Sequence, residues 1–274
     1  MAIFTQRTIG TERSHVTAYD HGAHVAQWTI GSVPVIWVSR LARYAADQSI
    51  RGGIPVCWPW FANGPDGQRT PSHGLVRTVG WTLQEQESDR LLWTLSSADL
   101  PQHSRLLFDQ GFESTMEATV RADALVVSHT VTNTSPTAFT YELALHTYLH
   151  VGDVRDARLH GVDGVDYYDK VTGTQATQEG PLRISGEVDR IYRTPGPVRV
   201  QDPTLQRVIT LEASGARNVV VWNPGPDGAA KMSDFADQEW TQMLCVETAN
   251  IDDNAVALEP GQSHSTSVRV SVGS

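Results

Sequence analysis

Two arginines and a histidine surround a rigid, aromatic turn in the segment RGGIPVCWPWFANGPDGQRTPSHGLVR (51–77). Arg51 precedes a Gly-Gly pair, and Ser72, His73 and Arg77 follow a Gly/Asn/Asp loop. Arginine forks bind phosphate or carboxylate, aromatic side chains suit a ligand with an apolar face, and histidine titrates near neutral pH. The segment therefore predicts part of a pocket for a small molecule.

A second histidine-bearing segment, FTYELALHTYLHV (139–151), has the alternating polarity of a strand. Period-two alternation places a mainly apolar set on one face and a polar set on the other. The polar set comprises Glu142, Ala144, His146, Tyr148 and His150. Two histidines, an acid and a tyrosine are typical of a ligand-binding surface, but an ordinary solvated face can have the same composition.

Glu247 lies within the apolar run LCVETAN (244–250) near the C-terminus. A buried carboxylate is costly unless it is hydrogen-bonded or ion-paired, and such residues often serve function. The alternative is that strand alternation directs Glu247 to solvent. His146 and Glu247 together supply one acid and one base, the two groups that general acid–base catalysis requires. A neighbouring carboxylate is also expected to keep the imidazole protonated at pH 7.

Other chemistries have less support in the sequence. On a strand, His146 and His150 would lie roughly 13 Å apart, too far to share a metal ion. His21 and His24 would point to opposite faces. No G-x-S-x-G elbow, P-loop or dinucleotide fingerprint occurs. We therefore expect neither a metal nor a cofactor.

Composition limits the partners. The 274 residues carry a formal charge of −10, which argues against nucleic acid or an anionic membrane as a partner. The only two cysteines, Cys57 and Cys245, lie in apolar runs and are expected to be reduced packing residues. No apolar run approaches the about 20 residues that cross a bilayer, and the N-terminus lacks a signal-peptide pattern. We expect a soluble, cytoplasmic protein.

The elements that must position these residues are short β-rich segments separated by Gly, Pro, Asn or Asp. Expected strands span 24–30, 33–39, 112–121, 124–133, 139–151, 218–223, 244–250 and 265–272. A short helical turn is expected over 234–244. No series of helices provides parallel crossovers, so the pattern predicts an all-β protein, an antiparallel β-sandwich, in one domain over 1–274.

Five segments, taken in order, resemble a known family. They are RGGIPVCWPWF, SHGLVR, ELALHTYLHVGD, EVDRIY (187–192) and MSDFADQEWTQMLCVETAN, and they span residues 51–250. They are similar to those of the D-hexose-6-phosphate mutarotases (glucose-6-phosphate 1-epimerases), within the aldose 1-epimerase, galactose mutarotase-like superfamily. The resemblance implies a large antiparallel β-sandwich, the galactose mutarotase-like supersandwich, with a concave active-site face and no cofactor.

The resemblance also implies roles for individual residues. His146 matches the family's catalytic acid and Glu247 its catalytic base. Arg51, Arg77 and Asp189 match substrate-binding residues.

The segment SHGLVR, which contains the His73-Gly74 pair, provides the remaining match to the family and also departs from the family pattern at two positions. His73 matches the histidine that contacts the sugar. Ser72 stands where the family commonly has Gln, so its reach to substrate would be shorter. Leu75 stands where it usually has Phe, which would remove an aromatic wall. Both departures bear on sugar specificity rather than on the reaction.

The implied reaction is interconversion of the α and β anomers of a hexose 6-phosphate, glucose 6-phosphate first, by a monomeric enzyme. Two alternatives stay open. One is an aldose 1-epimerase acting on unphosphorylated sugars, and the other is a non-catalytic carbohydrate-binding sandwich, which would need neither His146 nor Glu247.

Overall fold

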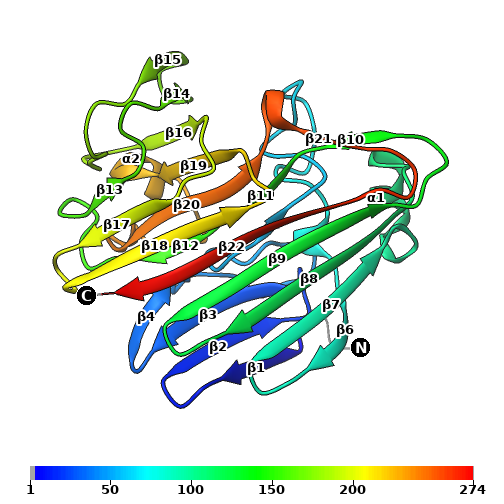
Figure 1. Cartoon of the computed structure of the whole chain (residues 1–274), viewed down its shortest axis with the longest axis horizontal. Coiled ribbons are helices and arrows are strands. Elements are labelled where there is room, and N and C mark those ends of the chain that lie inside the picture. Colours follow the sequence, from blue (N-terminus) through cyan, green and yellow to red (C-terminus); the bar gives the residue numbers. More distant parts are fainter. Residues whose placement is uncertain (1–3, 274) are drawn as a thin grey trace.

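The computed structural model describes residues 4–273, which form two large antiparallel sheets and a two-stranded one (Figure 1). The twelve-stranded sheet runs β1-β2-β3-β4-β12-β20-β19-β16-β14-β15, with β11 joining β20 to β5. The eight-stranded sheet runs β13-β17-β18-β22-β9-β8-β7-β6. The architecture confirms the predicted all-β antiparallel sandwich.

The bounds of the elements follow. The strands of the twelve-stranded sheet are β1 (Gln6–Gly10), β2 (Ser14–Tyr19), β3 (His24–Ile30), β4 (Val33–Ile36), β5 (Val56–Cys57), β11 (Leu143–Leu145), β12 (Tyr148–His150), β14 (Asp166–Asp169), β15 (Thr174–Thr177), β16 (Val188–Tyr192), β19 (Asn218–Asn223) and β20 (Met243–Asn250). Those of the eight-stranded sheet are β6 (Thr82–Gln86), β7 (Arg90–Ser96), β8 (Phe112–Val120), β9 (Ala124–Asn133), β13 (Arg158–His160), β17 (Val198–Asp202), β18 (Arg207–Ser214) and β22 (Ser263–Gly273). The small sheet pairs β10 (Phe139–Tyr141) with β21 (Val256–Leu258), and the helices are α1 (Gln102–Leu107), α2 (Gly225–Ala229) and four 3₁₀ turns (Val76–Thr78, Ser97–Asp99, Glu239–Gln242, Asp252–Asn254).

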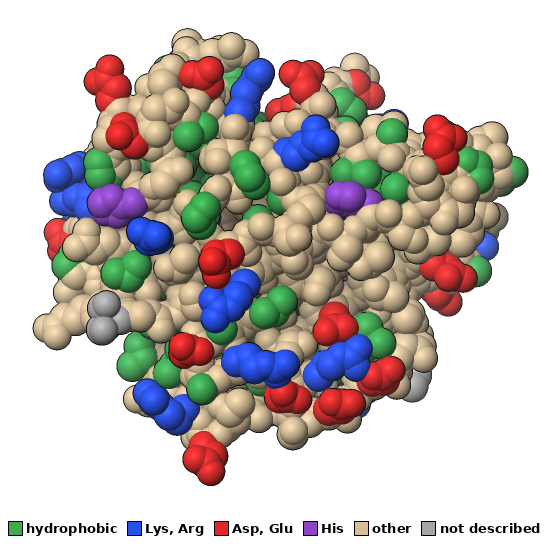
Figure 2. Space-filling view, viewed as in Figure 1, with side chains coloured by type: hydrophobic (Ala, Val, Ile, Leu, Met, Phe, Trp, Pro, Cys, Tyr) green, Lys and Arg blue, Asp and Glu red, His purple; other side chains and the backbone are tan. Residues whose placement is uncertain are grey.

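The core lies between the two large sheets. Strands β7, β8 and β9 alternate buried and partly exposed side chains, as expected for a sheet that packs on one face. Their buried residues join Leu244 and Val246 of β20 in one apolar cluster. On the other, partly exposed face of β7 and β8, Arg90 pairs with Glu85 and Glu117, and charges of both signs alternate over this part of the surface (Figure 2).

The twelve-stranded sheet is buried on both faces near its middle, because every residue of β20 is buried. Cross-strand register identifies its second face. Glu247 lies opposite Val220 of β19, Val220 opposite Ile191 of β16, and Ile191 opposite Tyr168 of β14. Directly opposed residues in antiparallel strands point to the same side. We call this side, which faces away from the eight-stranded sheet, the site face.

One expectation about local structure is wrong, and another is confirmed over only part of its range. Segment 139–151 forms three strands rather than one. The backbone amide of Glu142 donates to the Pro59 carbonyl, and that of His146 donates to the Pro55 carbonyl, so neither amide is available to the neighbouring strand of the sheet. β10 then pairs with β21, whereas β11 and β12 pair with β20. The helical turn over 234–244 is confined to Glu239–Gln242, since β20 already begins at Met243.

Two further features concern expectations from composition. Cys57 and Cys245 are buried and free, as expected. Within residues 4–273, no helix is long and apolar enough to cross a bilayer.

Candidate functional site

His146 and Glu247 meet on the site face. His146 follows β11 and Glu247 lies in β20, and the two strands pair, so the imidazole Nε2 lies 3.4 Å from Glu247 Oε1. The side chains are only 8% and 1% exposed. Within the described residues, His146 Nδ1 and Glu247 Oε2 have no hydrogen-bond partner. A buried pair with unused polar atoms is costly unless it serves a ligand. We call this pair the dyad.

The electrostatics of the dyad differ from the expectation of an imidazolium held by a carboxylate. Burial, and then the positive charges of Arg77 and Arg51, lower the pKa of His146 well below its ordinary value. Burial, and then the carboxylate of Asp189, raise the pKa of Glu247 well above its ordinary value. Both shifts favour the neutral form of each group, an uncharged imidazole on His146 and a protonated carboxyl on Glu247. A single shared proton is what an acid–base pair needs.

His73 reaches the dyad from the turn that precedes Arg77. Its ring lies 5.5 Å from that of His146 and edge-on to Phe61 at 4.9 Å. Its φ of 64° is in the left-handed region, which is strained for a residue other than glycine. The strain is held by hydrogen bonds to Ala62 at both the backbone and Nδ1. Burial and the Arg77 charge lower the pKa of His73, so a neutral ring accepts at Nδ1 and can donate from Nε2 to a ligand.

The glycine after His73 is required by a close approach. Gly74 has a φ of 78°, and a Cβ there would lie 2.0 Å from the carbonyl oxygen of Trp58. This contact brings the turn against the Trp58 strand segment and lets Arg77 follow in a short 3₁₀ helix. The Arg77 guanidinium donates to the Ser72 carbonyl at 2.8 Å. No carboxylate among residues 4–273 lies within ion-pair distance of it. Arg77 is therefore a partly buried cation without a partner anion.

Arg51 enters the site from the other side. The next residue, Gly52, has a φ of 113°, and a Cβ there would lie 2.5 Å from the Trp37 carbonyl oxygen, so the Gly-Gly pair seats this chain against β4 and its extension. The Arg51 guanidinium donates to Asp234 at 3.2 Å and to the Tyr148 hydroxyl at 3.1 Å. Tyr148 in turn stacks on His146, with ring centroids 4.7 Å apart. Arg51 is thus connected to the dyad through one aromatic ring.

Asp189 lies across the sheet from Arg51, in β16 opposite Trp222. Its carboxylate pairs with Lys170 at 3.0 Å. The Lys170 ammonium also lies over the Phe61 ring, 5.5 Å from its centroid. Lys170, in the turn that follows β14, therefore connects the edge of the sheet to the loop that carries Phe61.

The structure thus brings together six of the seven predicted residues as side chains around one point: His146, Glu247, Arg51, His73, Arg77 and Asp189. Ser72 contributes its carbonyl, through Arg77. Sequence reasoning missed Lys170 and the wall residue Trp222. Tyr148, which the sequence places in the polar set of 139–151, forms a second wall. The rings of Tyr148 and Trp222 each lie within 6.2 Å of the His146 ring.

Other expected site features lie elsewhere. Leu75 is 2% exposed within the inter-sheet core, so the departure from Phe does not remove a wall of the site. Of the Pro-Trp-Phe cluster only Phe61 faces the site, because Trp60 donates to the Pro71 carbonyl and lies under Arg69. His150 lines a separate hollow beside Trp37. The described residues hold no group of three or more His, Cys, Asp or Glu arranged to bind a metal.

Comparisons with known proteins identify the family of the chain. The sequence profile of the aldose 1-epimerase family matches residues 6–271. A relative from Salmonella typhimurium, named provisionally as a glucose-6-phosphate 1-epimerase, is 32% identical over 241 residues, which cover 83% of this chain and 76% of that protein. An Escherichia coli relative of the same name is 31% identical over 264 residues, or 91% and 84% of the two chains.

Solved structures of other proteins share the fold of the chain. The crystal structure of a Salmonella typhimurium protein named provisionally as a mutarotase (YeaD) has a TM-score of 0.87 at 24% identity and covers all of this chain and 94% of its own. A Synechocystis protein, Slr1438, has a TM-score of 0.83 at 21% identity and covers 98% of this chain and 96% of its own. The family profile covers nearly the whole chain, and the chain therefore belongs to the aldose 1-epimerase family and is a sugar epimerase.

Proposed function

We propose that the enzyme interconverts the α and β anomers of a hexose 6-phosphate, with glucose 6-phosphate as the first candidate. The observation that supports phosphate binding is the state of Arg77. Its guanidinium is partly buried, has no carboxylate partner among residues 4–273, and shares the site with Arg51. Burying an unpaired charge is costly, so such a cation is best explained by an anionic ligand. Arginine forks match phosphate oxygens in geometry.

The dyad supplies the chemistry. In ring opening, Glu247 as base takes the proton of the C1 hydroxyl while His146 as acid protonates the ring oxygen O5, so that the C1–O5 bond breaks as the C1 carbonyl forms. Rotation about C1–C2 presents the other face of the aldehyde. In closure, His146 takes the proton of the O5 hydroxyl and Glu247 returns one to O1. The two oxygens are bonded to the same carbon, which suits two groups only 3.4 Å apart.

Phosphate binding is also expected to change the pKa of His146, the acid of the dyad. In the unliganded site the charges of Arg77 and Arg51 lower the pKa of His146. A phosphate dianion on these arginines offsets both fields, so it moves the pKa of His146 back up and favours the protonated imidazole that ring opening needs. Phosphate thereby acts as more than an anchor.

Anomer exchange by NMR tests the proposal on glucose 6-phosphate and on free glucose at one enzyme concentration. Faster exchange of the phosphorylated sugar alone supports both the reaction and the phosphate site. Equal acceleration of both sugars keeps the reaction and removes the phosphate site, leaving an epimerase of unphosphorylated sugars. No acceleration of either sugar overturns the proposal.

If bound phosphate raises the pKa of His146, the pH profiles of kcat for glucose 6-phosphate and for glucose should differ. Because the bound phosphate raises the pKa of His146, the imidazole stays protonated to higher pH. The alkaline limb of kcat should therefore lie at higher pH for glucose 6-phosphate than for glucose. Exchange rates at saturating sugar across pH 5–10 measure this, and limbs that coincide, or that lie in the reverse order, contradict it.

Lys170 provides a test of the base. Its charge lowers the pKa of Glu247, whereas Asp189 raises it. Lys170→Met removes the ammonium and leaves the Asp189 carboxylate unpaired, so the pKa of Glu247 rises further and less of the carboxylate base is present at low pH. The acid limb of kcat should therefore move to higher pH, which lowers kcat on the acid side of the profile.

The chain contains only one other lysine, the exposed Lys231, so Lys231→Met is a matched control. Lys170→Arg should restore most of the shift, because it returns the charge. A Lys170→Met profile that superimposes on the wild-type profile would exclude a role of this lysine in tuning Glu247.

A further inference from the structure

The two arginines of the site have different partners. No carboxylate among residues 4–273 lies within ion-pair distance of Arg77, whereas Arg51 pairs with Asp234 at 3.2 Å. Asp234 lies in the loop between α2 and the Glu239–Gln242 turn and takes no part in the acid–base chemistry described above. A carboxylate beside a cation that binds phosphate repels the phosphate, so its presence requires an explanation.

Neighbouring residues hold the Asp234 loop against the site. The Phe235 side chain is almost fully buried, and its ring packs on that of Trp37 with centroids 5.0 Å apart. The backbone amide of Ala236 donates to the buried Glu239 carboxylate at 3.0 Å. The Asp234 carboxylate is therefore held at one place rather than free to swing away from a ligand.

Arg51 is held from two directions. Its Nε donates to Asp234, and its Nη1 donates to the Tyr148 hydroxyl at 3.1 Å. Tyr148 is fixed in turn, because its ring stacks on Trp37 and on His146. Among residues 4–273, no acceptor binds Nη2, which leaves this amino group and the second N–H of Nη1 for the oxygens of a ligand. Asp234 thus orients the arginine that the proposed function assigns to phosphate.

The same carboxylate limits the positive charge of the site. The Arg51 and Asp234 charges cancel, so Arg77 is the unbalanced cation of this pair of arginines. The two guanidinium groups lie near enough to interact, because burial and, to a smaller extent, the Arg51 charge lower the pKa of Arg77. A phosphate dianion that bridges them would also lie near Asp234, whose charge would repel it.

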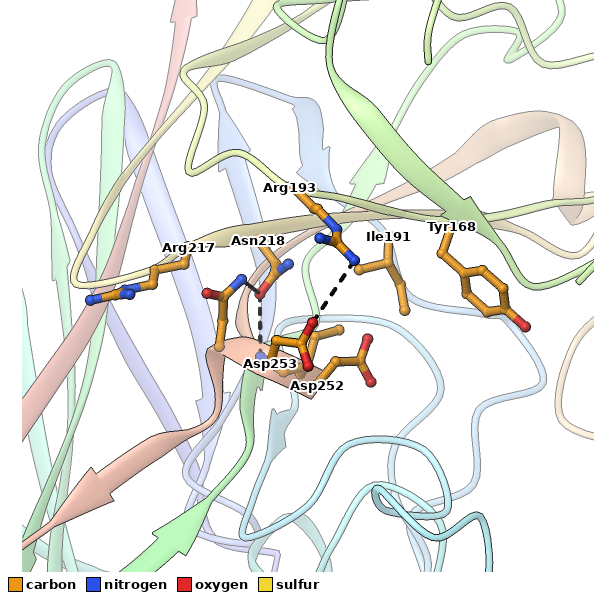
Figure 3. Close-up of a pocket in the computed structure, with 9 residues that line it drawn as sticks. Tyr168, Ile191, Arg193, Arg217, Asn218, Asp252 and Asp253 are labelled. Carbon is orange, nitrogen blue, oxygen red and sulfur yellow. Dashed lines mark hydrogen bonds and ion pairs between the residues drawn. The ribbon is translucent and has the colours of Figure 1, made fainter. Parts of the chain in front are cut away.

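An arginine–aspartate pair outside the site shows what distinguishes Arg51 and Asp234. Arg193 and Asp253 lie 3.9 Å apart and line a separate hollow (Figure 3). Their side chains are 60% and 91% exposed, so water and salt screen the pair. The side chains of Arg51 and Asp234 are only 25% and 23% exposed. A change of charge at Asp234 should therefore affect a bound anion more strongly than the same change at Asp253.

Moderate affinity for phosphate suits an anomer exchange. Substrate and product differ only at C1 and carry the same phosphate, so contacts with the phosphate bind both equally. Such uniform binding lowers KM without raising kcat, and very tight binding slows the release of product. A carboxylate that weakens phosphate binding while it keeps Arg51 in position therefore favours turnover.

We propose that Asp234 is a specificity-determining residue, which orients Arg51 and competes with the ligand phosphate for it. Asp234 is the counter-ion of Arg51 in the unliganded site and keeps the affinity of that site for phosphate moderate. Free inorganic phosphate binds the same arginines and competes with glucose 6-phosphate. The inference rests on the proposed function, because it requires the phosphate to bind at Arg51.

The experiment measures KM for glucose 6-phosphate and for glucose, and the inhibition constant of inorganic phosphate against glucose 6-phosphate. Asp234→Asn removes the charge but retains an oxygen that can accept from Arg51. KM for glucose 6-phosphate and the inhibition constant should both fall about two- to fivefold, the usual effect of a partly exposed ion pair. KM for glucose should change less than about twofold, because glucose has no charge for Asp234 to repel.

Two further variants separate charge from orientation. Asp234→Ala removes the acceptor as well as the charge, so Arg51 loses its orientation and the gain seen in Asp234→Asn should be lost. Asp253→Asn is the matched control, since it removes the carboxylate from an exposed arginine pair outside the site. It should leave all three constants unchanged.

The outcomes separate this inference from the proposed function. If wild-type enzyme prefers glucose 6-phosphate but Asp234→Asn leaves its KM unchanged or raises it, the inference is wrong and the proposed function stands. An equal fall of KM for glucose, or a fall in Asp234→Ala as large as that in Asp234→Asn, also overturns the inference. If wild-type enzyme has the same KM for both sugars and inorganic phosphate does not inhibit, the phosphate site is wrong and the inference fails with it.

Discussion

Glu247→Gln is expected to lower kcat for anomer exchange of glucose 6-phosphate by about 10²–10⁴-fold, the usual contribution of one general acid–base group. The amide has the shape of the carboxyl group but can neither take the C1 hydroxyl proton nor hold the shared proton of the dyad. Because the group lies 3.4 Å from His146 and is 1% exposed, water has little access to replace it. NMR exchange at saturating sugar gives kcat directly.

Binding and folding should change much less in this variant. The glutamine retains the volume of a fully buried side chain in β20, and the phosphate contacts come from Arg51 and Arg77, so KM should stay within a few fold. Glu239→Gln is the matched control, since Glu239 is also buried and accepts hydrogen bonds from Ser39 and Ala236 away from the dyad. Glu239→Gln should retain most of kcat even if it unfolds at a lower temperature than the wild-type protein. Near-normal turnover by Glu247→Gln would remove Glu247 from the chemistry.

The sequence predicts the strands best where one face is buried and local polarity alternates. The bounds of β3, β9 and β19 coincide with the predicted segments, and those of β8 and β20 differ by one residue at one end. Polar edge strands were not predicted. β15, TQAT, is exposed at every position, and its pairing with β14 rather than its composition makes it a strand. The prediction of one strand over 139–151 is wrong because the breaks in it depend on Pro59 and Pro55, which lie 83 positions before Glu142 and 91 before His146.

Prediction of the site from the sequence also fails where a residue's place depends on pairing between distant segments. His146 and Glu247 stand out because charged or titratable groups in apolar strands have few structural uses. Lys170 gives no such signal, since it follows an unremarkable polar segment. Its place beside Asp189, on the same side of the sheet as Glu247, follows from the order β20-β19-β16-β14, and strand order is a property of long-range pairing. The same register explains why Tyr168, 79 positions before Glu247, shares a row with it.

Arg51→Met should lower kcat/KM for glucose 6-phosphate much more than kcat/KM for free glucose. Hydrogen bonds to charged groups contribute about 1.5–3 kcal/mol, so loss of this fork should lower kcat/KM for glucose 6-phosphate about 10- to 150-fold. Free glucose loses no such contact. The Arg51 charge also lowers the pKa of His146 in the unliganded site, so its removal should favour the protonated imidazole and preserve turnover of glucose. Paired kcat/KM measurements on the two sugars give the selectivity ratio.

Arg43→Met is the appropriate control for this ratio, because Arg43 is a nearby exposed arginine that donates to the Ser233 carbonyl, next to Asp234, rather than entering the site. It should leave selectivity unchanged. Arg51→Lys should recover only part of the loss, since an ammonium restores the charge without the two-pronged geometry. If Arg51→Met slowed both sugars equally, Arg51 would act through Tyr148 and its stacking on His146, and the phosphate would have to be held by Arg77 alone.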